Sequence, residues 1–250
     1  MFAAAFMSLS WFALLPVFIG LCIVYFARDL ISAVYNQTNM TQVYICNIQA
    51  FLSLNGLNLV TDSRKESIRA YVQNKDKARC LVSGLLLRQI CGVTEDSQLV
   101  YGNNGKPYLK NSTMYFNISH SGDYVVLAIS NREIGIDIEN IERKAPYSSK
   151  VAARCFTKQE CEWMGEGDNE PFFRLWTAKE SIMKASGFGF SLPPESFCVL
   201  PMDGSAHYIV GKNWFLEWIL YDDYIICLAI EREADKSEII TIMPDELLIA

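Results

Sequence analysis

The sequence predicts an α+β protein whose two similar halves pack together as a pseudo-dimer. One observation is that the order strand, helix, strands appears twice along the chain. The other is size: 250 residues, of which 51% are hydrophobic and 20% charged, suit one globular unit or two small ones with a proper core. No sequence repeat is visible, so the prediction of two halves depends on the order of the elements.

Composition disfavours several classes of function. A net charge of −6 argues against a general nucleic-acid binder. The eight cysteines include no C-x-x-C pair, which is typical of free thiols in a reducing compartment such as the cytoplasm, not of a disulfide framework or a zinc site. The two histidines, His120 and His207, are too few for a histidine-based metal cluster.

The first 39 residues form an apolar extension. Met1–Ala27 has no charged side chain, and about 20 apolar residues span a bilayer as a helix, so a single transmembrane anchor is one interpretation. No Lys or Arg precedes the apolar run, which weakens a signal-peptide interpretation. Met40 stands just before the first predicted strand, so a start codon assigned too early explains the extension equally well. A buried helix is the third alternative.

The remaining chain is expected to form an N-terminal half over 40–145 and a C-terminal half over 146–250. Runs of apolar and β-branched residues, turn signals and helical periodicity locate the elements. In the N-terminal half they predict strands at Thr41–Ala50, Tyr115–Ser119, Tyr124–Ser130 and Glu133–Asn140, a helical region at Thr61–Ile90 and a turn at Gly102–Pro107. In the C-terminal half they predict a helix that begins at Phe172 and ends near Gly187, within the stretch Phe172–Phe190, and strands at Phe197–Leu200, Trp214–Tyr221 and Tyr224–Ile230.

The segment Glu133–Glu139, EIGIDIE, alternates isoleucines with a glycine and two acids, Asp137 and Glu139. This is the pattern of a strand with one apolar face and both carboxylates on the other. Two such carboxylates repel each other unless a positive charge lies between them, and Mg²⁺ prefers oxygen ligands of this kind. A solvated strand face is the alternative interpretation.

In the predicted helix within Phe172–Phe190, residues on one side recur at helical spacing. Glu180 and Lys184 are four residues apart and therefore neighbours on that side, and Gly187 marks the end of the helix. An amphipathic helix with an ordinary exposed ion pair explains the same pattern. Glu180 would add a third carboxylate to Asp137 and Glu139 if strand and helix meet, which spacing alone does not establish.

Two further features lie between these segments. Thr157 and Glu160 have capping-box spacing, so we interpret Glu160 first as a helix cap and less as a metal ligand. Arg143–Lys158 contains five basic residues and no acid, which suits either a docking face for an acidic partner or a solvated helix surface.

Five short motifs stand in order along the chain: Gly105-Lys106-Pro107, FNISHS at Phe116–Ser121, IGIDIE at Ile134–Glu139, FTKQE at Phe156–Glu160 and WTAKESIMK at Trp176–Lys184. Any one of them is a weak signal. Together, over roughly Thr41 to Leu248, the chain resembles the Sfp-type 4′-phosphopantetheinyl transferases, the double-length members of the holo-carrier-protein synthase superfamily.

The resemblance implies the pseudo-dimeric 4′-phosphopantetheinyl transferase fold in a monomer, with Mg²⁺ held by Asp137, Glu139 and Glu180. It implies catalytic roles for Glu180, Lys184 and His120. It also implies coenzyme A contacts from Arg64, Arg79, Lys106, Ser119, His120 and Lys184. Arg79 matches a family arginine well and Arg64 matches a basic position loosely, whereas Ser67 stands where another basic residue is often found.

The activity implied is transfer of the phosphopantetheine arm of coenzyme A to a serine of an apo acyl, peptidyl or aryl carrier protein, with release of 3′,5′-ADP. The pathway, whether fatty-acid, polyketide or nonribosomal-peptide synthesis, is not implied. No nucleic-acid partner is expected, and a membrane contact is expected only if the apolar extension is a real anchor. A non-catalytic coenzyme A or carrier-protein binding module on the same fold is the alternative function, and a membrane-tethered structural protein is a second rival.

Overall fold

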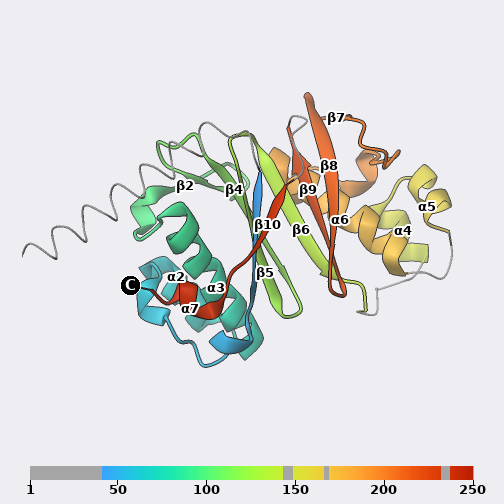
Figure 1. Cartoon of the computed structure of the whole chain (residues 1–250). Coiled ribbons are helices and arrows are strands. Elements are labelled where there is room, and N and C mark those ends of the chain that lie inside the picture. The colour runs from blue at the N-terminus through green and yellow to red at the C-terminus, as the bar shows by residue number, and fades with distance from the viewer. Residues whose placement is uncertain (1–40, 143–148, 166–168, 232–236, 250) are drawn as a thin grey trace, which may run out of the picture. The chain divides into compact units, whose positions relative to one another are not determined.

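The structure, a computed structural model, describes residues 41–142, 149–165, 169–231 and 237–249, with the backbone alone for 149 and 150. The prediction for the apolar extension therefore lies outside the described residues. Across the ranges just given, every helix is too short or too polar to cross a membrane. In Figure 1, strands stand between α2 and α3 (Asp62–Ala70 and Asn74–Cys91) on one side and α4, α5 and α6 (Ser149–Cys155, Lys158–Met164 and Asn169–Ser186) on the other.

The first sheet has the strand order β10-β1-β5-β4. Its members are β1 (Gln42–Asn47), β4 (Tyr115–Ser121), β5 (Tyr124–Ser130) and β10 (Glu238–Thr241). β5 pairs antiparallel with both β1 and β4, whereas β10 lies parallel to β1. The C-terminal segment thus completes the sheet of the first half, and the short helix α7 (Pro244–Leu247) that follows contacts α3.

The second sheet has the strand order β6-β9-β8-β7 and is antiparallel throughout. Its members are β6 (Ile134–Asn140), β7 (His207–Ile209), β8 (Lys212–Tyr221) and β9 (Tyr224–Ile230). β6, expected in the N-terminal half, therefore pairs with a strand from the C-terminal half. The expected boundary at 145 lies outside the described residues and stays a prediction. A separate hairpin consists of β2 (Leu99–Tyr101) and β3 (Pro107–Leu109).

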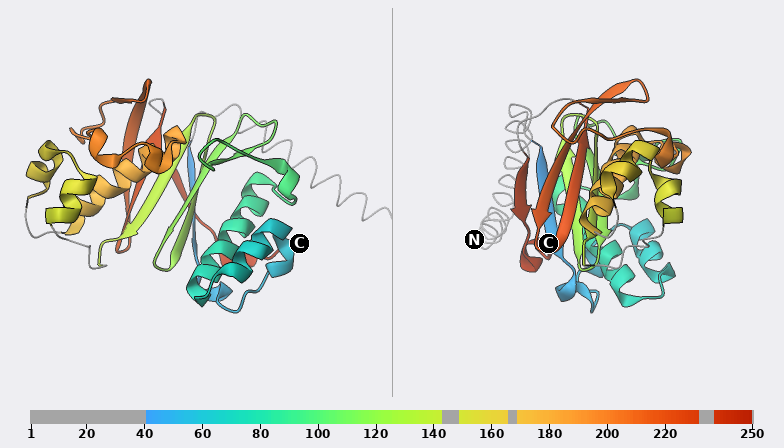
Figure 2. Two further views of the ribbon diagram at one scale, coloured as in Figure 1. Left: turned by 180° about the vertical axis from the view of Figure 1, so that it is seen from behind. Right: turned by 90° about the vertical axis from the view of Figure 1, so that its right-hand side faces the viewer.

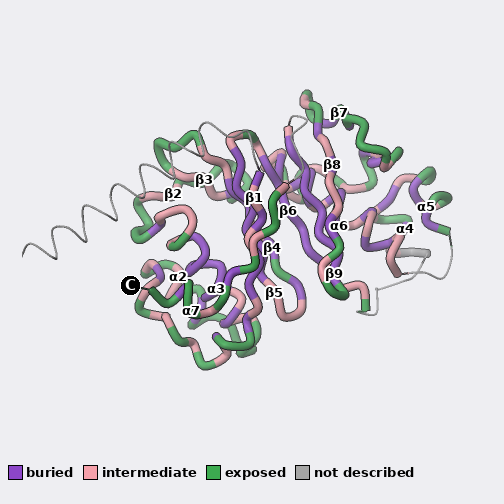
Figure 3. Tube along the Cα trace, viewed as in Figure 1, coloured by how far each residue is buried: buried purple, intermediate pink, exposed green. Residues whose placement is uncertain are grey.

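Two apolar clusters hold these layers together. One lies between the sheets and contains the three isoleucines of β6 with residues such as Val43, Val126 and Leu228. The other lies between the second sheet and α6 and contains residues such as Ile182, Trp214 and Cys227. Figure 3 shows β6, β9 and much of α6 as buried, and Figure 2 shows the same succession of helices and strands from behind. The α+β class expected from the sequence is confirmed.

The structure differs from the sequence prediction at three places. The strand expected at Thr41–Ala50 is shorter, Gln42–Asn47, and a 3-10 helix at Gln49–Phe51 follows it. The helical region Thr61–Ile90 is two helices, because Tyr71 and Gln73 are extended between α2 and α3. The predicted strand Phe197–Leu200 is wrong, since it has no strand partner in the described residues. Its backbone is bound by side chains instead: Val199 N–H donates to Glu160 Oε1 at 2.8 Å, and Lys179 Nζ donates to Phe197 O at 2.5 Å.

Candidate active site

β6 and α6 lie in direct contact because Gly135 has no side chain. A Cβ at this position would lie 2.0 Å from the carbonyl oxygen of Ser181 and 2.4 Å from the backbone nitrogen of Ala185. The alternation predicted for β6 is confirmed, since its isoleucines enter the cluster between the sheets. Asp137 and Glu139 therefore point the other way, toward α6.

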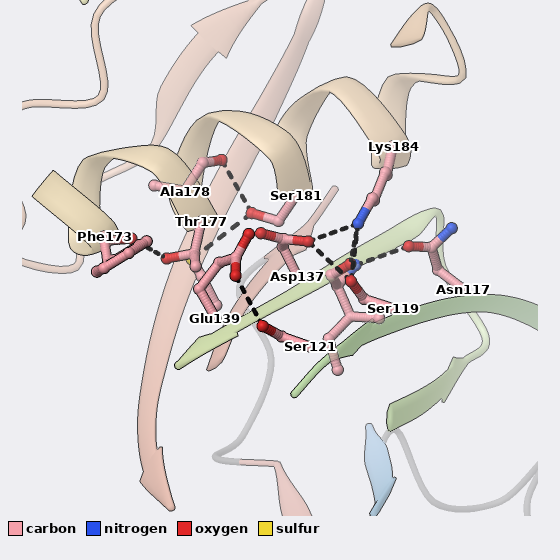
Figure 4. A network of polar contacts seen from close by, with 12 residues as sticks. Asn117, Ser119, Ser121, Asp137, Glu139, Phe173, Thr177, Ala178, Ser181 and Lys184 are labelled. Atoms are coloured by element: carbon pink, nitrogen blue, oxygen red, sulfur yellow. Dashed lines mark hydrogen bonds and ion pairs between the residues drawn. The ribbon is translucent and has the colours of Figure 1, made fainter. Parts of the chain in front are cut away.

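The carboxylate of Asp137 is the centre of a polar network (Figure 4). Lys184 Nζ lies 2.6 Å from Asp137 Oδ1, and Ser119 Oγ donates to the same oxygen at 2.8 Å. Lys184 also donates to Ser119 Oγ at 2.9 Å. The second oxygen, Asp137 Oδ2, is buried and has no hydrogen-bond partner among the described residues. A buried carboxylate oxygen is stable only with a partner, so Asp137 Oδ2 is suited to bind a cation or to accept a hydrogen bond.

Strand β4 contributes a ladder of three side chains that bind β6. Asn117 Oδ1 accepts the Ile136 N–H at 2.9 Å, Ser119 donates to Asp137, and Ser121 Oγ donates to Glu139 Oε2 at 2.8 Å. The sequence analysis did not single out Asn117 or Ser121. Their signal was present, because three alternate positions of the apolar strand FNISHS are polar and so share one face.

Glu180 extends from α6 into the same region. Burial raises the pKa of Glu180 to about 7, and the charges of Asp137 and Glu139 add to this effect while Lys184 opposes it. A carboxyl group with a pKa near neutrality exchanges a proton readily at physiological pH, which is what general acid–base chemistry requires.

The carboxylates do not form a closed metal centre in the structure. Within the described residues, no group of three or more His, Cys, Asp or Glu side chains has the geometry to hold a metal ion. The Lys184 ammonium already neutralises part of the charge here, since it lies 2.6 Å from Asp137 Oδ1. Two features still fit a hard cation: the oxygen chemistry of the three acids and the unpartnered Asp137 Oδ2.

Arg79 and His120 lie near this centre, on the side of the first sheet. Arg79 donates from Nε and Nη2 to the carbonyl of Gly122, at 3.0 and 2.6 Å, and from Nη1 to Asp76 at 2.7 Å. His120 is exposed on β4, yet enclosure by the surrounding protein lowers its pKa, and the charges of Arg79 and Lys184 lower it further. The structure thus brings two cations close to this imidazole, and both favour its neutral form. Arg64 lies on α2 with Nη1 3.8 Å from Cys80 Sγ.

Lys106 is not the exposed turn lysine that its sequence context suggests. Only 8% of the residue is exposed, and Nζ donates to the carbonyls of Ile134 at 3.1 Å and Ala185 at 2.8 Å. Burial lowers the pKa of Lys106 to about 8. The side chain therefore ties the β2–β3 hairpin to the start of β6 and the end of α6, while its contact with coenzyme A stays a prediction.

Glu160 has the predicted capping role and a second one. Thr157 and Glu160 form a capping box, which confirms the cap. Glu160 also pairs with Lys179 at 2.8 Å, where neither side chain is exposed. In the basic segment, Arg143 and Lys144 and the side chain of Lys150 lie outside the described residues, while Arg154 and Lys158 are exposed. A docking role for this segment stays a prediction.

Comparison with known proteins gives consistent matches along the chain. The model of the 4′-phosphopantetheinyl transferase superfamily matches residues 133–229, and that of the 4′-phosphopantetheinyl transferase N-terminal region matches residues 52–132. A 4′-phosphopantetheinyl transferase of Aneurinibacillus migulanus is 37% identical over 60% of this chain and 63% of its own length. The Sfp transferase of Bacillus subtilis strain 168 is 33% identical over 60% of this chain and 70% of its own length. The L-aminoadipate-semialdehyde dehydrogenase-phosphopantetheinyl transferase of Mus musculus is 30% identical over 71% of this chain and 69% of its own length. The chain thus spans about two thirds of the length of these relatives.

Proposed function

The chain belongs to the 4′-phosphopantetheinyl transferase superfamily, and from this premise we propose that it modifies apo carrier proteins. The acceptor serine oxygen forms a bond to the phosphorus that bears the pantetheine arm. The pyrophosphate P–O bond breaks, 3′,5′-ADP leaves with the electron pair, and the serine proton passes to a base. The observation that carries this proposal is the Asp137 carboxylate, bound by Lys184 and Ser119 on one oxygen and unpartnered on the other.

Attack on a pyrophosphate is promoted mainly by positioning and by neutralising charge. Asp137, Glu139 and Glu180 would hold Mg²⁺, which supplies positive charge against the pyrophosphate oxygens when bound. The Lys184 ammonium is a second source of positive charge, and Arg79 and His120 bind the nucleotide end of coenzyme A. These assignments are supported by the motif match and by the electrostatic coupling of Glu180 to Asp137, Glu139 and Lys184.

Glu180 is the proposed acceptor of the serine proton. Its pKa of about 7 favours this role over Asp137, whose Oδ1 already accepts from an ammonium and a hydroxyl. A carboxylate that also contacts a metal is a weak base, so transfer through a bridging water is consistent with the same assignment. The pathway in which the carrier protein acts is open.

Incubation of the full chain with coenzyme A, Mg²⁺ and a panel of apo carrier proteins, read by intact mass, tests the proposal. A carrier protein should gain the mass of one phosphopantetheine. Asp137→Ala and Glu180→Ala should each abolish the gain, whereas Asp203→Ala, an exposed acid in a loop, should not change it. Coenzyme A binding without any mass gain across the panel would favour a non-catalytic binding module.

A further inference from the structure

The turn between β4 and β5 connects residues that the proposed function places at opposite ends of the site. Gly122 O accepts two hydrogen bonds from Arg79. Ser121, which precedes it, donates to Glu139, and Asp123, which follows it, forms an ion pair with Lys75 at 2.7 Å. The turn Ser121–Asp123 therefore supports both a coenzyme contact on α3 and a carboxylate on β6.

One side chain from the opposite sheet fixes this turn. Tyr224 begins β9, pairs with Asn140 at the end of β6, and is only 7% exposed. Its phenol oxygen accepts the Asp123 N–H at 3.1 Å. A Cβ at Gly122 would lie 2.1 Å from the same phenol oxygen, so the turn packs directly against the hydroxyl, and Gly122 adopts a φ of +53° that favours glycine.

The ring of Tyr224 is itself rigidly held. It packs edge-on against Tyr124 with ring centroids 5.0 Å apart, and Tyr124 packs edge-on against Tyr221 at 5.4 Å. Tyr124 donates its own hydroxyl to Asp222 at 3.0 Å, on the turn between β8 and β9. The three rings form one cluster, but the hydrogen bond from the backbone of the β4–β5 turn goes to Tyr224.

We propose that Tyr224 is a positioning residue: its hydroxyl holds the Ser121–Asp123 turn so that Arg79 and Glu139 keep their places relative to each other. The proposal rests on the function proposed above. Loss of the hydroxyl leaves the Asp123 N–H without its partner and removes the atom that lies nearest to Gly122. The turn then samples other positions, and Arg79 and Ser121 move with it.

Tyr224→Phe in the full chain tests the proposal, because it deletes one oxygen and keeps the ring. Coenzyme A binding, measured by calorimetry in EDTA, should weaken about fivefold or more, the effect of one lost hydrogen bond. In transfer assays with Mg²⁺, KM for coenzyme A and the Mg²⁺ concentration for half-maximal rate should both rise, while kcat at saturation changes less than about twofold. Loss of folded protein alone would lower kcat without moving either concentration.

Tyr124→Phe is the matched control, since it removes a hydroxyl from the same cluster that binds Asp222 and not the backbone of the turn. It should leave coenzyme A affinity and both half-saturating concentrations at wild-type values. Equal effects of the two variants, or unchanged coenzyme A affinity in Tyr224→Phe, would overturn the proposal. If the wild type transfers no phosphopantetheine, the proposed function fails, whereas the calorimetric comparison still reports on Tyr224.

Discussion

Lys179 Nζ and Glu160 Oε2 lie 2.8 Å apart, and neither side chain has any exposed area. Lys179 also donates to the carbonyls of Pro194 and Phe197, while Glu160 accepts from Thr157 and Val199. The pair thus ties α5, α6 and the chain after α6 into one unit. Lys179 directly precedes Glu180 in the sequence, so the ion pair also fixes the part of α6 that carries the proposed base.

Removing one partner of this ion pair should destabilise the protein strongly. Lys179→Met leaves the Glu160 carboxylate buried without its cation, and we expect the free energy of unfolding to fall by about 3–5 kcal/mol in urea titrations. Glu160→Gln combined with Lys179→Met should recover part of this loss, because no unpaired charge stays buried. The control is Lys158→Met, which breaks the exposed pair with Glu162 and should change stability by less than about 1 kcal/mol. Similar losses at both lysines would contradict a structural role for the buried pair.

Gly135→Ala should separate the two elements of the site. The new methyl group would meet backbone atoms of Ser181 and Ala185, which cannot rotate away, so α6 must shift from β6. We expect a loss of about 1–3 kcal/mol in unfolding free energy. We also expect transfer activity per folded molecule to fall, which the loss of stability alone would not cause. Gly102→Ala, whose methyl group would lie 3.3 Å from the Tyr108 ring, is the matched control. Full activity in the folded Gly135→Ala variant would mean that the distance between β6 and α6 does not matter for the reaction.

Much of this site could be predicted from local sequence, because strand alternation and helix spacing put Asp137 and Glu139 on one face and Glu180 beside Lys184. Local sequence could not predict that the two faces meet, which only the family resemblance implied, since the contact depends on Gly135 and on segments distant in sequence. The pairing of β10 with β1 was not predicted either, because its register depends on tertiary structure. At Phe197–Leu200 the apolar pattern indicated a strand, but buried side chains took the hydrogen bonds of the backbone.

Lys106 and Arg79 should respond differently to removal of their charge, although the resemblance implies that both contact coenzyme A. Lys106→Met leaves the carbonyls of Ile134 and Ala185 without a donor, so unfolding free energy should fall by about 1–3 kcal/mol along with coenzyme affinity. Arg79→Ala should weaken coenzyme A binding with a smaller effect on stability, because its partners lie at the edge of the fold and can bind water. Calorimetry measures the coenzyme A affinity of each variant, and urea unfolding of the same preparations measures its stability. Unchanged affinity in either variant would remove that residue from the coenzyme site.

The pKa of Glu180 makes a prediction about stability as a function of pH in EDTA. The unfolded carboxyl ionises near its ordinary pKa of 4.5, whereas the folded carboxyl keeps its proton to about pH 7. The folded state therefore binds this proton more tightly than the unfolded state. The stability that the proton contributes is fully present below pH 4.5 and is lost as pH rises toward 7. Glu180→Gln cannot ionise, so it should match the wild type near pH 4 and be more stable by about 1–3 kcal/mol at pH 8, as judged by urea unfolding.

The difference between wild type and Glu180→Gln cancels the titrating residues that do not interact with Glu180, so it reports on Glu180 together with its electrostatic partners Asp137, Glu139 and Lys184. Added Mg²⁺ at pH 8 should then stabilise the wild type more than the variant, since a metal ligand gains by binding only in the folded state. A difference that does not vary with pH would show that Glu180 ionises normally and would weaken its assignment as the base. A normal pH profile in EDTA together with equal Mg²⁺ responses would remove Glu180 from the metal site as well, and Asp137 and Glu139 would then be left as the proposed ligands.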